Sequence, residues 1–175
     1  MVELEGFDLS EPESELVPKI MKNLHTVGFF VVKNVPNFEP DQLYSAINSF
    51  YQDVPDGERL KLATRNFNSK AENIVRGILP FVDNAASHRE IYDMGLSLKR
   101  CSDEALKLPL YEDTPFPPQE EFKWIQEYFE KQLDMFNNLS IRLMELIALG
   151  LGKDRDYFTE WFREDHLSTF RVIHI

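Results

Sequence analysis

The sequence predicts an α+β fold, because amphipathic helical repeats and short β-prone runs follow one another along the chain. The strongest signal is an apolar repeat at helical spacing, which predicts one long helix of about 30 residues that starts at Pro118, and two shorter helical repeats precede it. Runs of β-branched and aromatic residues at 29–32, 91–94 and 168–175 indicate strands. The 175 residues are 43% apolar and 28% charged, which is an ordinary composition for one globular domain.

The charge balance and the cysteine count narrow the functional classes. The chain has 30 Asp and Glu against 19 Lys and Arg, so nucleic acid and anionic membranes, which attract clustered basic residues, are not expected partners. Cys101 is the only cysteine, which excludes an intrachain disulfide and a cysteine-based zinc or iron–sulfur site. No apolar run approaches the ~18 residues of a membrane span, and the acidic N-terminus lacks a signal-peptide pattern. We therefore expect a cytoplasmic protein.

The first predicted helix is followed directly by a predicted strand. Apolar residues at helical spacing mark the helix: Leu16, Val17, Ile20, Met21 and Leu24. Ser10 or Ser14 is expected to cap its N-terminus, and Pro18 indicates either the later start or a kink. Gly28 is expected to end the helix, and the continuous apolar run at 29–32 predicts a buried strand.

The central part of the chain contains one further helix and mostly irregular structure. Pro40 suits a helix start, and four apolar residues form the next stripe: Leu43, Ile47, Phe50 and Tyr51. Residues 55–57 indicate a turn, residues 91–94 indicate a short strand, and residues 99–118 form a proline-rich connector.

The long helix and the strand after it suggest that other structure must cover this chain. The helix is expected to end at Gly150 or Gly152, and its repeat consists of Phe122, Ile125, Phe129, Leu133, Phe136, Ser140, Leu143 and Ile147. A length of roughly 45 Å makes it a scaffold. A short helix is expected at 157–162, and residues 168–175 predict a strand for which the sequence offers few partners. We therefore expect the N-terminal part of a larger protein, or a chain that pairs its strand with another chain.

No catalytic residue and no metal ligand can be assigned from residue patterns. His88-Arg89-Glu90 has the His-x-acid spacing of a non-haem iron site, with His166 or His174 as a second histidine, but a solvated histidine beside an ion pair explains the triplet as well. An unrelated α+β enzyme that uses His88, Glu90 and His166 stays open as a third hypothesis. The segment 150–153 fails the phosphate-loop pattern and indicates a helix end.

Five segments follow the order and approximate spacing of motifs from one known family. They are 28–35 (GFFVVKNV), Arg76-Gly77, 88–95 (HREIYDMG), ALGLG at 148–152 followed by Tyr157-Phe158, and 168–174 (STFRVIH). They resemble the GFF.V.NHG strand, the RGY turn, the KE.FD.G segment, the A.GLGL....F helix end and the S.LRL..Y strand of the isopenicillin N synthase-like Fe(II)/2-oxoglutarate-dependent oxygenases.

This resemblance implies the fold and the chemistry of the intact protein. It implies a double-stranded β-helix, or jelly roll, with the long helix along its outside and the sheet incomplete in this chain. Residues 1–118 correspond to the non-haem dioxygenase N-terminal domain, and residues 119–175 to the long helix and the first strand leading into the catalytic barrel. The intact protein would use Fe(II) and 2-oxoglutarate to oxidise a small-molecule substrate.

The resemblance also limits what this chain can do alone. The family's iron-binding His-x-Asp, its distal histidine and its Arg-x-Ser cosubstrate clamp follow the last matched strand, and no His-x-Asp occurs in these 175 residues. His88 falls in a segment that does not ligate iron. Arg171 and His174 lie on the strand that leads toward the cosubstrate pocket, so they are the candidate cofactor-adjacent residues. We expect an oxidoreductase portion that is inactive and cofactor-free alone; the alternative is a non-catalytic binding module.

Overall fold

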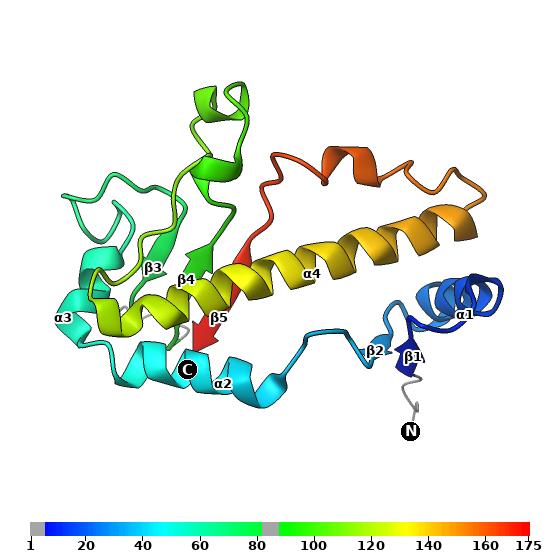
Figure 1. Ribbon diagram of the computed structural model, residues 1–175, viewed down its shortest axis with the longest axis horizontal. Helices are drawn as coiled ribbons and strands as arrows, with labels where there is room; N and C mark the ends of the chain where they lie inside the picture. Colours follow the sequence, from blue (N-terminus) through cyan, green and yellow to red (C-terminus); the bar gives the residue numbers. More distant parts are fainter. Residues whose placement is uncertain (1–5, 82–87) are drawn as a thin grey trace. The chain divides into compact units, whose positions relative to one another are not determined.

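The computed structural model describes residues 6–81 and 88–175, and it has the predicted α+β class (Figure 1). The chain divides into two units, each with its own hydrophobic core. Unit 1 consists of residues 6–38 and 135–164, and unit 2 consists of residues 39–134 and 165–175. Among the described helices, none is both long enough and apolar enough to cross a membrane.

Unit 1 is built on two short parallel strands and the helix between them. Strand β1 (Gly6–Asp8) pairs with β2 (Val31–Lys33), and helix α1 (Glu13–Thr26) makes the crossover that a parallel pair requires. The core of this unit contains Phe7, Leu16, Ile20 and Leu146. Gly28 has φ +89 and directly follows the helix cap, so the predicted helix end is confirmed.

Three details of unit 1 differ from the sequence predictions. Pro12 occupies the N-cap position of α1, and no side chain there makes a capping hydrogen bond, so neither Ser10 nor Ser14 caps the helix. Pro18 lies inside the helix. The strand predicted at 29–32 is displaced to β2, and it is not buried: Val31 is 43% exposed. A two-stranded sheet can bury only one face, and here Phe30 packs on Phe7 while its neighbours point to solvent.

Unit 2 contains a three-stranded antiparallel sheet in the order β3-β4-β5. The strands are β3 (Gly77–Leu79), β4 (Glu90–Met94) and β5 (Phe170–His174). Ile78, Tyr92 and Val172 are aligned across the three strands and almost fully buried, so this row forms the core face of the sheet. Side chains alternate along a strand, so the neighbouring residues project from the opposite face.

The core face of the sheet packs against two helices. Helix α2 (Pro40–Gln52) starts at Pro40 as predicted and contributes Phe50, whose ring stacks on Tyr92 at 4.5 Å between centroids. Helix α4 (Lys123–Gly150) contributes Phe129, whose ring lies 6.0 Å from that of Phe170 on β5. The turn predicted at 55–57 is the start of a four-residue helix, α3 (Asp56–Arg59).

The long helix confirms the strongest sequence signal, with two corrections. It begins at Lys123 instead of Pro118, because a short 3-10 turn, η4 (Glu120–Phe122), precedes it. The predicted stripe is buried in the first half, at Ile125, Phe129 and Leu133. In the second half the buried residues are Leu146 and Ala148, since these turns belong to unit 1 and meet a different core.

The last strand is not the isolated element that the sequence suggested. β5 pairs with β4 over five residues, from Glu90↔His174 to Met94↔Phe170, and Figure 1 shows it beside β4. The expectation of an unpaired strand is therefore wrong for the edge of β5 that faces β4. At the other edge of β5, no strand from residues 6–81 or 88–175 pairs. The prediction failed because β4 and β3 are short, and the sequence between residues 57 and 88 has weak periodicity.

Candidate functional site

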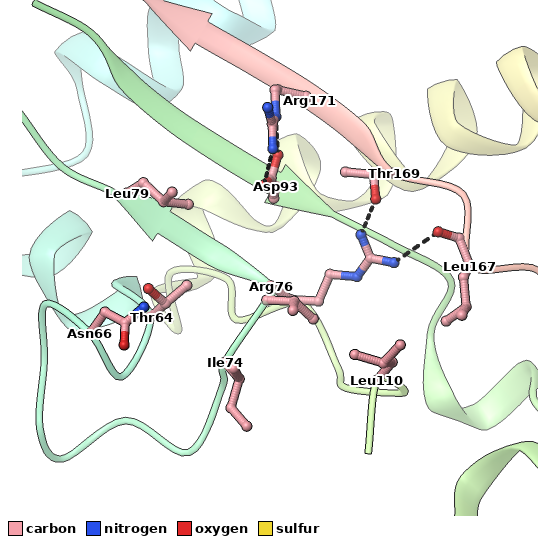
Figure 2. Close-up of a pocket in the computed structure, with 11 residues that line it drawn as sticks. Thr64, Asn66, Ile74, Arg76, Leu79, Asp93, Leu110, Leu167, Thr169 and Arg171 are labelled. Carbon is pink, nitrogen blue, oxygen red and sulfur yellow. Dashed lines mark hydrogen bonds and ion pairs between the residues drawn. The ribbon is translucent and has the colours of Figure 1, made fainter. Parts of the chain in front are cut away.

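The candidate site is an open pocket of about 420 Å³ in unit 2, shown in Figure 2. It lies on the face of the sheet opposite the core, because Leu79, Asp93 and Arg171 alternate with the buried row. The remaining lining residues come from the loop before β3, the connector and the segment before β5: Thr64, Asn66, Ile74, Val75, Arg76, Leu110, Leu167 and Thr169. The lining is thus partly apolar, with a few charged and hydroxyl groups, as in sites for small molecules.

Arg76 is the buried cation of the pocket. Its residue is only 6% exposed, and its guanidinium group donates to Thr169 Oγ1 at 2.7 Å and to the Met94 carbonyl at 3.1 Å. Longer bonds of 3.4 Å reach the carbonyls of Leu167 and Ser168. Gly95 leaves the space for the guanidinium, since an added Cβ there would lie 2.4 Å from it. Arg76 therefore ties the segment entering β5 to β4.

Arg171 and Asp93 form a bidentate ion pair in the same pocket. Arg171 Nε and Nη2 donate to the two carboxylate oxygens of Asp93 at 2.6 and 2.7 Å. The Asp93 side chain is 8% exposed, whereas that of Arg171 is 50% exposed. The hydrogen bonds to Asp93 raise the pKa of Arg171, so this guanidinium stays charged and fixed in orientation.

His174, the second residue suggested by the resemblance, does not line this pocket. It has the same parity on β5 as Val172, and its ring stacks on Tyr51 at 4.5 Å between centroids. Its Nδ1 atom is 3.9 Å from the buried carboxylate of Glu90, which also lies 3.7 Å from Arg59 Nη2. The two suggested residues therefore lie on opposite faces of the sheet, and only Arg171 lies at the candidate site.

The described residues of this chain do not fit an iron centre. Within residues 6–81 and 88–175, no three His, Cys, Asp or Glu side chains gather closely enough to hold a metal ion. His88 is exposed, while the Glu90 carboxylate is buried beside Arg59, so the His-x-acid triplet does not converge. His166 is buried in another part of unit 2, where burial lowers its pKa. The third hypothesis, an enzyme using His88, Glu90 and His166, thus gains no geometric support.

Other motifs have structural roles. The helix-end interpretation of 150–153 is confirmed, because Lys153 N donates to the Ala148 carbonyl at 2.9 Å and Gly152 has φ +67.

One Arg-x-Ser triplet, the pattern of the family's cosubstrate clamp, occurs at 100–102. Its Arg100 side chain binds Asp134, and its Ser102 hydroxyl donates to Asp165. These contacts hold the connector in place and leave the triplet no evident binding role.

Arg76 and Asp93 have no predicted role from residue patterns, although both lie in segments that carry the family resemblance. The available sequence signal is the alternation of side chains between the two faces of a short strand. Asp93 follows the buried Tyr92 on β4, and Arg76 directly precedes β3. The contact between Arg76 and Thr169 spans 93 residues of sequence, which no local pattern can reveal.

Comparisons with known proteins identify what the chain is similar to. No known family profile matches it. Isopenicillin N synthase from Amycolatopsis lactamdurans is 24% identical over 157 residues, which cover 89% of this chain and 48% of that enzyme. The resemblance to isopenicillin N synthase-like oxygenases is confirmed. The chain spans about half the length of this relative.

Two solved structures share the fold of this chain. A 2OG-Fe(II) oxygenase family protein from Caulobacter crescentus matches all of this chain and 57% of its own, with a TM-score of 0.79 and 17% identity. A full-length protein from Neurospora crassa, in complex with alpha-KG and 5-formyluracil, matches 90% of this chain and 47% of its own, with a TM-score of 0.64 and 22% identity. The chain therefore has a fold found in these proteins.

Proposed function

We propose that this chain is the N-terminal portion of an Fe(II)- and 2-oxoglutarate-dependent oxidoreductase that acts on a small molecule. The observation that carries the proposal is the match to isopenicillin N synthase across 89% of the chain but 48% of that enzyme. The fold shared with a 2OG-Fe(II) oxygenase family protein supports the same conclusion. The small ligands in the Neurospora crassa complex support a small-molecule substrate.

In this proposal, β5 leads into a jelly-roll barrel that further chain completes. Residues 1–118 are the N-terminal domain, and residues 119–175 supply the scaffold helix and the first barrel strand. No strand within residues 6–81 and 88–175 pairs with the outer edge of β5, and Ile173 and Ile175 are 47% and 92% exposed. The pocket on the same sheet then faces the space that the barrel encloses, and Arg171 is the cosubstrate-adjacent residue, with His174 behind the sheet.

The chemistry of this chain alone follows from the donor groups it contains. In this proposal Fe(II) and 2-oxoglutarate bind to the intact protein, and its further residues supply the iron ligands. The role of this chain in the proposal is to hold the sheet, the Arg76 tie and the Asp93–Arg171 pair in a fixed arrangement.

The test compares this chain with a longer product of the same reading frame. Both are supplied with Fe(II), 2-oxoglutarate and oxygen, and succinate is measured. We expect succinate from the longer product and none above the buffer level from the chain alone. Steady succinate formation by the chain alone, abolished by His88→Ala, would overturn the proposal in favour of a site within these residues.

The second candidate function is a non-catalytic module that pairs the outer edge of β5 with another chain. The exposed Ile173 and Ile175 favour it. It predicts a stable complex between this chain and a second polypeptide in the native source, with no longer product of the same reading frame. Denaturing electrophoresis of the sedimented native material separates this outcome, which gives a 20.5 kDa chain with a partner, from the oxygenase proposal, which gives one longer chain.

A further inference from the structure

Residues 165–169, which we call the strap, are the segment through which the chain enters β5. Asp165 fastens the start of the strap. Its carboxylate accepts hydrogen bonds from Ser102 N at 2.7 Å and from Ser102 Oγ at 2.5 Å, and its carbonyl accepts one from the Tyr111 hydroxyl. Asp165 also has a φ of +48, a left-handed conformation that non-glycine residues rarely adopt. These bonds therefore hold the start of the strap in a conformation that a free chain would avoid.

Arg76 fastens the other end of the strap. Its guanidinium group donates to the Leu167 carbonyl and to Thr169 Oγ1, as Figure 2 shows. His166 lies between these two sets of bonds, so the position of its side chain is fixed from both sides. The residue is only 5% exposed, and among the described residues its buried Nδ1 atom has no hydrogen-bond partner. His166 is thus a buried titratable group at the centre of the strap.

The charged groups around His166 disfavour its cationic form. Arg76 and Arg100 are the cations near its ring, and Asp134 is the nearby anion. The Asp134 carboxylate already binds Arg100, at 2.8 and 3.0 Å, and the carboxylate of the adjacent Asp165 is held by the connector. Burial, followed by the charge of Arg100, lowers the pKa of His166, and the opposing effect of Asp134 is smaller. The site therefore favours the neutral imidazole.

Protonation of His166 would place a poorly compensated charge inside unit 2. Both ring nitrogens of the cation are donors, so the buried Nδ1 would carry an N–H group without an acceptor among the described residues. This cost disappears when the ring reaches water. The bonds between Asp165 and Ser102 are exposed, whereas Val172 on β5 is buried, so the strap can open while the sheet stays folded.

We propose that acid releases the strap: charging of His166 frees residues 165–169 from the connector and from Arg76, and leaves β5 in the sheet. The stabilisation by the neutral ring is complete above the ordinary histidine pKa of 6.5 and is lost as the pH falls below that value. Because Leu167 and Thr169 line the candidate pocket, release opens one wall of it. The inference does not depend on the proposed function, since it concerns proton binding by this chain alone.

The test is amide hydrogen exchange of the full chain, followed by NMR at about pH 7.5 and about pH 5, on either side of the ordinary histidine pKa. Protection factors divide out the pH dependence of the chemical exchange rate. The amide of Ser102, which donates to Asp165, reports on the strap, and the amide of Phe50 reports on the core of unit 2. Asp165 itself stays ionised in this range, because the bonds from Ser102 lower its pKa.

Two histidine variants are compared in this experiment. His166→Gln cannot be charged, and His25→Gln is the matched control, since His25 is exposed on α1. In the parent chain, the protection of the Ser102 amide should fall by about fivefold or more at the lower pH, and that of the Phe50 amide should fall less. His166→Gln should abolish the difference, and His25→Gln should leave it unchanged.

Three results would overturn the proposal: equal falls at Ser102 and Phe50, a fall that persists in His166→Gln, or no fall at all. If His166→Gln does not fold, the ring of His166 in the parent chain decides. Its NMR titration should have a midpoint below 6.5, and a midpoint at or above that value would contradict the release mechanism. None of these results bears on succinate formation, which tests the oxygenase proposal separately.

Discussion

Replacing Phe129 by alanine tests whether β5 is part of the packed core of unit 2. Phe129 is 1% exposed, and its ring lies 6.2 Å from that of Phe50 on α2 and 6.0 Å from that of Phe170 on β5. The change removes contacts to a helix and to the last strand at once and leaves a cavity between them. Truncation of such a buried phenylalanine costs about 3–5 kcal/mol, a large part of the total stability of a domain.

The assay is urea denaturation followed by circular dichroism, with Trp124→Ala as the control on the same helix. Trp124 is 45% exposed, so its removal should change the free energy of unfolding by less than about 1 kcal/mol. A loss below about 1 kcal/mol for Phe129→Ala would show that the side chain is not enclosed by α2 and β5. The description of unit 2 as a sheet packed on two helices would then be wrong.

Three further changes test other parts of the structure. Tyr92→Phe should cost about 1–3 kcal/mol in the same assay, because it leaves the partly buried Pro115 carbonyl without the hydroxyl that donates to it at 2.6 Å; an unchanged midpoint would contradict that bond. Gly77→Ala should destabilise by about 1–3 kcal/mol, since φ is +123 and a Cβ would lie 2.3 Å from a backbone oxygen, whereas Gly57→Ala, in open space, should not. Hydrogen bonds from two arginines hold the pKa of Glu13 at about 2 instead of 4.5, so their stabilisation is present above pH 4.5 and is lost as the pH falls toward 2. Glu13→Gln should therefore flatten the decline of the melting temperature across that range, and a decline as steep as in the parent chain would contradict the ion pairs.

The helices were the most predictable part of the fold. Leu43, Ile47, Phe50 and Tyr51 have the spacing of one helical face, and α2 begins at Pro40, because the fixed φ of proline suits a first helical position. The long helix was equally clear from its repeat. The sequence did not predict which residues of this helix are buried. The helix contributes to two different cores, and the apolar period alone does not specify which core each turn will meet.

The sheet and the candidate site were harder to predict, because they depend on contacts between distant parts of the chain. β3 has only three residues, so its pairing with β4 leaves almost no periodic signal. The bond from Arg76 to Thr169 and the pair between Asp93 and Arg171 both join residues far apart in sequence. Arg171 was suggested by its motif alone, and its partner Asp93 became visible only through the strand register.

The intact mass of the native protein tests the central claim most directly. If the chain is the N-terminal portion of an oxygenase, mass spectrometry of the protein from its natural source should give a mass well above 20.5 kDa. Peptides that continue past Ile175 should then contain a His-x-Asp sequence. A native product of 20.5 kDa that ends at Ile175 would contradict the claim.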